Sequence, residues 1–108
     1  MSPNNKKKLA LIRVKLDKLD NQLLSLVKKR TILVNDVLKL KEFKNEIVDK
    51  KRINLILKRI KLKSKKIKID PIITNRIWKN MIWSYINYEK KNFKKKIIIY
   101  YEVEVFFL

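Results

Sequence analysis

An unbroken repeat of apolar residues occupies the first part of the chain and limits what it can fold into. From Leu9 to Leu40 these residues are spaced three and four positions apart, with no glycine or proline between them. This spacing places one apolar stripe along a single α-helix and is typical of helices that pair with other helices. It predicts a helix over about residues 6–43, on the order of 55 Å long at about 1.5 Å per residue. The repeat positions are Leu9, Ile12, Leu16, Leu19, Leu23, Leu26, Arg30, Leu33, Val37 and Leu40.

Two capping signals predict two shorter helices after the long one. Asp49 can cap a helix over about residues 50–62, because its carboxylate can accept a hydrogen bond from a first-turn N–H. Asp70 and Pro71 predict a third helix that ends at about Phe93, with proline at the first helical position. The predicted fold class is all-α, with one long and two shorter helices per chain. The expected inward positions are Ile53, Ile56, Leu57, Ile60, Ile73, Ile77, Met81, Ile82, Tyr85 and Ile86.

The length of 108 residues indicates one small domain with little core of its own. We expect helices from a second copy of the chain to complete that core. Residues 1–8 form a basic lead and residues 9–93 the helical domain. Residues 94–108 form an extension that we expect to be disordered, because its β-branched and aromatic residues have no partner strand elsewhere.

The missing residue types exclude several kinds of chemistry. The chain has no cysteine and no histidine, so it lacks a thiol nucleophile, an imidazole base and the usual ligands of zinc. We therefore expect neither a metal nor a cofactor, and an enzyme of this composition would work by holding and polarising its substrate. No apolar run reaches the roughly 20 residues that a membrane helix needs. The lack of cysteine is compatible with a reducing cytoplasm, which is the expected location.

The formal net charge of +19 is compatible with binding to nucleic acid or to an anionic membrane. The lysines are spread over the whole chain, however, and their clusters fall at expected helix ends and loops. We interpret them as solvated surface and do not expect a nucleic-acid partner. A basic helical nucleic-acid-binding protein stays an alternative, and its binding would fall steeply with salt. A coiled-coil scaffold without a ligand is a second alternative.

Arginine is scarce in this lysine-rich chain, and Arg30 takes a position of the apolar stripe. Its planar fork can grip a carboxylate with two hydrogen bonds, whereas an unpaired buried charge costs several kcal/mol, roughly. Its partner is either an internal carboxylate, such as Asp36 or Glu89, or the anion of a ligand. Lys41 lies 11 residues further on and points the same way about 16 Å along the axis. The pair could bracket a small dianion.

Arg13 lies 17 residues before Arg30, which places it on the order of 25 Å away along the helix and about a quarter turn off. It cannot reach the same small ligand from the same helix. If it belongs to the site, a partner chain must supply it, which an antiparallel pairing of two long helices would allow. The other arginines are Arg52, Arg59 and Arg76.

Three stretches of the sequence together resemble the all-helical AroQ class of chorismate mutase. They are IRVKLDKLDNQLLSLVKKRTILVNDVLKLK, VDKKRINLILKRI and IDPIITNRIWKNMIWSYINYEKKNF, and the resemblance covers about residues 9–93. It implies an intertwined homodimer in which the long first helices pair and each of two sites takes an arginine from the other subunit. It also implies the conversion of chorismate to prephenate in the shikimate pathway of aromatic amino-acid biosynthesis.

By matched position, this resemblance assigns roles to the cations singled out above. Arg13 of the partner chain and Arg30 would clamp the carboxylates of the substrate, and Arg52 would complete the cationic wall. Lys41 would donate to the ether oxygen and to a carboxylate. Glu89, on the third helix, would face Lys41 across that oxygen, where many family members carry glutamine and a few carry glutamate. Lys41, Glu89 and Arg30 are the expected catalytic residues.

The resemblance also places Asp49 near the ring hydroxyl of the substrate. At two other positions the sequence departs from the pattern of the family. Ile53 stands where the family usually has a glutamate that receives this hydroxyl, and Tyr85 stands where it has a serine-type residue. At both positions the residue type resembles that of isochorismate pyruvate lyase instead. This relative has the same fold and forms salicylate and pyruvate. Chorismate mutase is the expected activity, and the lyase is the alternative.

Overall fold

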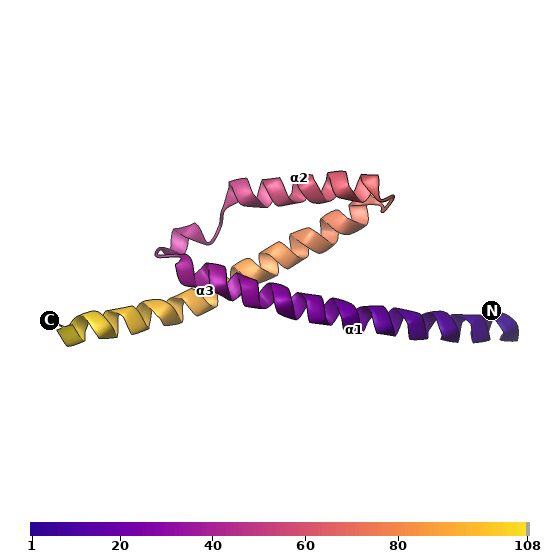
Figure 1. Cartoon of the computed structure of the whole chain (residues 1–108), viewed down its shortest axis with the longest axis horizontal. Coiled ribbons are helices and arrows are strands. Elements are labelled where there is room, and N and C mark those ends of the chain that lie inside the picture. Colours follow the sequence, from indigo (N-terminus) through magenta and orange to yellow (C-terminus); the bar gives the residue numbers. More distant parts are fainter. Residues whose placement is uncertain (108) are drawn as a thin grey trace. The chain divides into compact units, whose positions relative to one another are not determined.

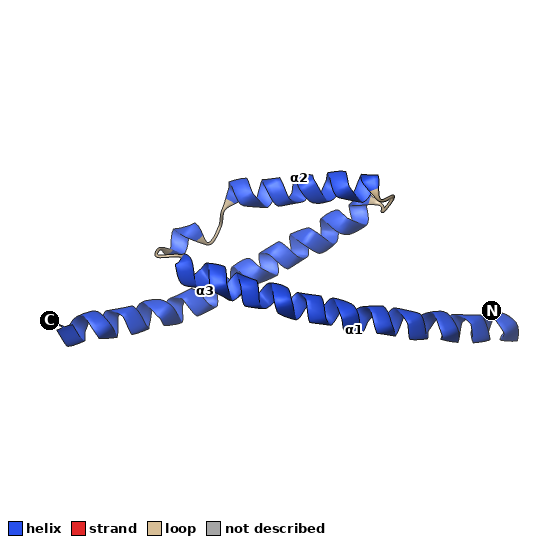
Figure 2. Cartoon of the chain, viewed as in Figure 1, coloured by secondary structure: helices blue, strands red, loops and turns tan. Residues whose placement is uncertain are grey.

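The computed structural model describes the backbone of residues 1–107 and the side chains of residues 1–93, and this backbone contains helices and connections but no strand. The elements (Figures 1 and 2) are α1 (Pro3–Leu40), the 3-10 turn η1 (Lys44–Glu46), α2 (Lys50–Lys66) and α3 (Pro71–Phe107). The prediction of an all-α chain with three helices is confirmed. α1 begins and ends three residues earlier than the predicted limits of 6 and 43.

The chain divides into two compact units, residues 1–34 and residues 35–108. The first unit is the larger part of α1. Ser2 caps this helix, because its side-chain oxygen accepts a hydrogen bond from the Asn5 N–H at 3.1 Å. Residues 10–29 are all exposed. The exposed fraction of the large apolar residues on the surface between positions 11 and 33 ranges from 46% to 67%. The predicted apolar stripe is therefore present, and this unit does not cover it.

In the second unit, α2 and α3 pack side by side as an antiparallel hairpin (Figure 1). Lys68 closes the turn with a φ of 62°, a left-handed conformation that costs a residue with a Cβ roughly 1–2 kcal/mol. Close to this turn, the hydroxyls of Ser64 and Thr74 lie 2.8 Å apart, and the Ser64 hydroxyl also donates to the Ile60 carbonyl at 2.6 Å. Both residues are buried, so this hydrogen bond joins the two helices where they meet.

Both predicted helix starts in this unit are confirmed. The Asp49 carboxylate accepts a hydrogen bond from the Arg52 backbone N–H at 3.0 Å, at the start of α2. The Asp70 carboxylate accepts one from the Ile72 N–H at 2.9 Å, directly before Pro71. Each carboxylate satisfies an N–H that has no partner inside its helix and lies at the positive end of the helix dipole.

Both predicted helix ends are wrong. α2 continues past Leu62 to Lys66, because Ser64 makes a buried contact with α3 and the lysines of the last turn favour the negative end of the helix. α3 continues past its predicted end at about Phe93 to Phe107, through most of the segment that the sequence sets apart as an extension. This stretch contains neither proline nor glycine, and β-branched residues lower helix propensity by only about 0.7 kcal/mol or less each. The side chains of residues 94–108 lie outside the described part of the structure.

The core of the second unit gathers residues from the end of α1, the connection and both other helices. It is formed by Leu38, Ile47, Ile82, Ile86 and Phe93, with Val48, Ile53, Ile56 and Leu57 packed against it. The inward positions predicted on α2 are confirmed as half-buried or better, and on α3 those from residue 81 to 86 are confirmed as well. Ile73 and Ile77 were wrongly assigned, because they are 55% and 53% exposed in the chain.

Candidate active site

Lys41 and Glu89 form an ion pair between the end of α1 and the middle of α3. The Lys41 Nζ lies 3.2 Å from Glu89 Oε1 and 3.4 Å from Oε2. Both side chains are largely withdrawn from solvent, with 17% and 8% of their surfaces exposed. Removing charges from water is unfavourable unless they are paired, so each holds the other in place. The structure thus brings together two residues that are 48 positions apart in the sequence.

Glu89 continues the buried face of α3. Ile82, Ile86, Glu89 and Phe93 are separated by three or four residues and are all buried, as expected for one side of a helix. A carboxylate in this series occupies a place that packing alone would give to an apolar residue. It is the partner of Lys41, and this pairing explains how the position can be charged.

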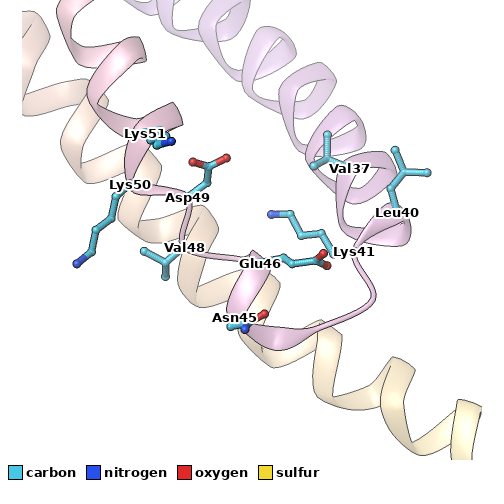
Figure 3. Close-up of a pocket in the computed structure, with 9 residues that line it drawn as sticks. All are labelled: Val37, Leu40, Lys41, Asn45, Glu46, Val48, Asp49, Lys50 and Lys51. Carbon is cyan, nitrogen blue, oxygen red and sulfur yellow. The ribbon is translucent and has the colours of Figure 1, made fainter.

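An open depression of about 720 Å³ lies beside Lys41 (Figure 3). Its volume is in the range of small-molecule sites, roughly 300–1,000 Å³. The lining comes from the end of α1, the connection and the first turn of α2, and it combines three lysines with two carboxylates. The lining residues are Val37, Leu40, Lys41, Asn45, Glu46, Val48, Asp49, Lys50 and Lys51. Such a mixture suits a polar, anionic molecule.

Glu46 organises the connection that carries Lys41. Its Oε2 accepts hydrogen bonds from the backbone N–H of Glu42 at 2.7 Å and from that of Phe43 at 3.1 Å. The hydrogen bond from the Phe43 N–H, and after it that from the Glu42 N–H, lower the pKa of Glu46 below its ordinary value. Desolvation opposes this effect, and the nearby charge of Lys41 adds to it. The carboxylate therefore stays ionised, and keeps both bonds, to a lower pH than a free glutamate would.

The family model of chorismate mutase type II matches residues 12–90, more than half of the 108-residue chain. The chain belongs to the chorismate mutase type II family. No curated protein and no solved structure matches it. The match includes Arg13 and Glu89, the first and last of the predicted site residues, and it leaves residues 1–11 and 91–108 outside. The match to this mutase family supports the mutase activity and does not confirm the resemblance to the lyase.

Of the residues predicted for the chorismate mutase site, the second unit brings three together. Lys41 contacts Glu89, and Lys41 and Asp49 line the same depression. Arg52 follows Asp49 in the first turn of α2 and is exposed. Arg13 and Arg30 belong to the first unit, where Arg13 is exposed and Arg30 is half-buried.

The two positions at which the sequence departs from the family lie on inward-facing sides of their helices. Ile53 is half-buried and packs against the core of the second unit. Tyr85, four residues before Glu89, is also half-buried. An isoleucine at position 53 can pack in this way, whereas it cannot accept a hydrogen bond from a substrate hydroxyl.

Sequence reasoning missed Glu46 and the bond between the Tyr88 hydroxyl and Asn35 Oδ1, which measures 2.8 Å. The only signal for Glu46 was an acidic residue within a short connection that lacks glycine.

Among residues 1–93, no group of three or more His, Cys, Asp or Glu side chains is placed to hold a metal ion. Within the described residues, no helix is long and apolar enough to cross a membrane.

Proposed function

We propose that this chorismate mutase rearranges chorismate to prephenate in a site built around the Lys41–Glu89 pair and completed by a second chain. The observation that carries the proposal is the buried ion pair beside a depression of ligand size, in a chain that belongs to this family. We take residues 9–93 as the catalytic domain and the cytoplasm as its location.

The rearrangement is pericyclic, so it needs no nucleophile, metal or obligatory proton transfer. Catalysis requires a dianion held in its reactive conformer and stabilisation of the negative charge that develops on the breaking ether oxygen. Arg30, Arg52 and Arg13 of the other chain are proposed to hold the carboxylates. Lys41 is proposed to donate to the ether oxygen. These roles account for an enzyme without histidine or cysteine.

The geometry of the pair suits this role for Lys41. An ammonium group has three donors, and the Glu89 oxygens lie within 3.4 Å of it on one side. A substrate oxygen can receive another of these donors while Glu89 keeps the lysine oriented. Asp49 lines the depression next to Lys41, where it is proposed to lie near the ring hydroxyl. Tyr85 is proposed to contact the substrate from α3.

The exposed stripe of α1 supports the homodimer. A helix of this kind gains most of its stability from packing of its apolar face rather than from intrinsic propensity. The stripe is self-complementary in an antiparallel pair of identical helices. The same pairing can carry Arg13 of one chain to the site of the other, because Arg13 is exposed on this helix.

Product identification tests the activity directly. Purified protein is incubated with chorismate and, separately, with isochorismate, and the products are separated and identified. Prephenate from chorismate alone is the expected result. Salicylate and pyruvate from isochorismate, without prephenate from chorismate, would assign the chain to the lyase instead.

Mixed dimers test the sharing of the site. Arg13→Ala and Arg30→Ala chains are each expected to be inactive alone, since each removes a clamp from both sites. After unfolding and joint refolding in equal amounts, half of the dimers are mixed and contain one intact site, so activity should return to about a quarter of that of the parent. A refolded mixture that stays inactive would contradict delivery of Arg13 by the partner chain.

A pH–rate profile tests the role of Glu89. A carboxyl group donates a hydrogen bond to the ether oxygen only when it is protonated, whereas an amide donates at every pH. Glu89 holds Lys41 while it is ionised and could donate to the ether oxygen only once it is protonated. The kcat/KM of the parent enzyme for chorismate is therefore expected to rise as the pH falls, and Glu89→Gln is expected to flatten this dependence. Parallel profiles of the two proteins would show that Glu89 is not the group at the ether oxygen.

A further inference from the structure

We propose that Glu46 is a positioning residue for Lys41, and that it acts on catalysis by fixing the backbone that follows this lysine. The inference rests on the proposed function, since it concerns the orientation of the proposed catalytic ammonium. Glu46 lines the same depression as Lys41 (Figure 3), although nothing in the reaction requires its side chain to touch the substrate.

Lys41 is the first residue after α1 ends at Leu40. Its backbone N–H still bonds to the Leu38 carbonyl at 3.2 Å, so the chain before it is fixed by the helix. The chain after it leaves the helix, and helical hydrogen bonds no longer restrain it. The direction of the Lys41 side chain consequently depends on what holds the next two residues as well as on its ion pair with Glu89.

Glu46 supplies that restraint. One oxygen of its carboxylate accepts the N–H groups of both Glu42 and Phe43, at 2.7 and 3.1 Å. The backbone N–H of Glu46 donates to the Phe43 carbonyl at 3.0 Å. Residues 43 and 46 are therefore joined by two hydrogen bonds, with one donor on each residue. Hydrogen bonds to an ionised acceptor are about twice as strong as neutral ones, so the two residues after Lys41 are held firmly.

The far end of this turn is anchored in the fold. Ile47, directly after Glu46, is only 3% exposed and belongs to the core with Leu38. Asp49 caps α2 two residues later. Glu46 therefore connects a fixed point in the core to the backbone next to Lys41. Without its carboxylate, residues 42 and 43 lose these hydrogen bonds, and Lys41 can turn away from Glu89.

The test compares Glu46→Ala, Glu46→Gln and the matched control Glu42→Ala. The control removes the same charge from the same connection but leaves the backbone N–H of residue 42 in place. Glu46→Ala is expected to lower kcat about tenfold or more through loss of orientation, while Glu46→Gln, which keeps an acceptor oxygen, stays within about threefold of the parent. Glu42→Ala should match the parent. Equal losses for Glu42→Ala and Glu46→Ala would overturn the proposal.

A second comparison separates positioning from a general effect on folding. In a Lys41→Met background, assayed at high enzyme concentration, Glu46→Ala is expected to lower kcat/KM by less than about twofold, because the group that it positions is already absent. An equal loss in both backgrounds, with helix content unchanged by circular dichroism, would show that Glu46 does not act through Lys41.

Amine labelling gives a readout that does not depend on the reaction. Lys41 is expected to be acetylated slowly by acetic anhydride, because its side chain is only 17% exposed. Glu46→Ala should raise its labelling severalfold in mass spectra, while Lys58, which is exposed on α2, should not change. Unchanged labelling of Lys41 overturns the positioning role. Raised labelling in a protein that does not convert chorismate supports that role and overturns the proposed function alone.

Discussion

Replacing Arg30 with leucine is expected to abolish catalysis while the protein stays folded. The residue stands in the apolar stripe of α1 and is half-buried, so leucine suits its packing position and removes a charge that is costly to bury. The melting temperature should stay the same or rise. The proposed clamp would lose two charge-assisted hydrogen bonds to a substrate carboxylate, which together should lower kcat/KM by a factor of about 10² to 10⁴.

Two further variants make the Arg30→Leu result specific. Arg30→Lys keeps the charge and loses the planar fork, so it should recover only a small part of the activity. Lys29→Leu removes a positive charge from the neighbouring exposed position and should leave kcat/KM close to that of the parent. Steady-state kinetics with chorismate and thermal unfolding at equal protein concentration provide the two measurements. An active Arg30→Leu protein would rule out this residue as a clamp.

Breaking the Lys41–Glu89 pair is expected to damage stability and activity separately. Lys41→Met removes the lysine from a carboxylate that has 8% of its side chain exposed, and this should lower the free energy of unfolding by roughly 3 kcal/mol. It also removes the proposed donor to the ether oxygen, which should lower kcat/KM by about 10²- to 10³-fold. Adding Glu89→Leu to Lys41→Met should restore most of the stability, because no buried charge remains.

The double variant should stay as inactive as Lys41→Met, which distinguishes the chemical role of the pair from its structural one. Denaturant unfolding gives the first quantity, and kcat/KM for chorismate gives the second. A double variant that is no more stable than Lys41→Met would show that Glu89 is not held by Lys41 in solution. Recovery of activity in the double variant would remove Lys41 from the mechanism.

The starts of α2 and α3 were predictable from sequence because they depend on local chemistry. Asp49 and Asp70 each cap the helix that they were expected to cap, since a carboxylate two or three residues before a free N–H can reach it without help from the rest of the fold. Helix ends were not predictable in the same way. The extension of α2 depends on Ser64 meeting Thr74 on another helix, which is a tertiary contact and leaves no local signal.

The residues of the candidate site also divide into those that the local sequence pattern indicates and those that depend on tertiary contacts. Arg30 could be singled out because it puts a charge in an apolar series, which is visible in the spacing of the residues. Glu89 was assigned to the site through the resemblance to the family. The contact between Lys41 and Glu89 required the fold, and in the sequence the resemblance to the family was the only guide to it. Glu46 was missed because it accepts hydrogen bonds from backbone N–H groups in a connection between helices. The sequence of this connection has no periodic pattern from which its conformation could be predicted.

In the proposed dimer, the exposed stripe of α1 makes the formation of active sites depend on protein concentration. Large apolar side chains along residues 11–33 stay about half accessible in a single chain, and the proposed dimer would bury them. In the proposed dimer, the stability of each chain cannot be separated from the amount of chain present, and active sites form in a second-order step. Dilution would then remove whole active sites rather than slow each one, and activity per chain would fall with protein concentration even at saturating substrate.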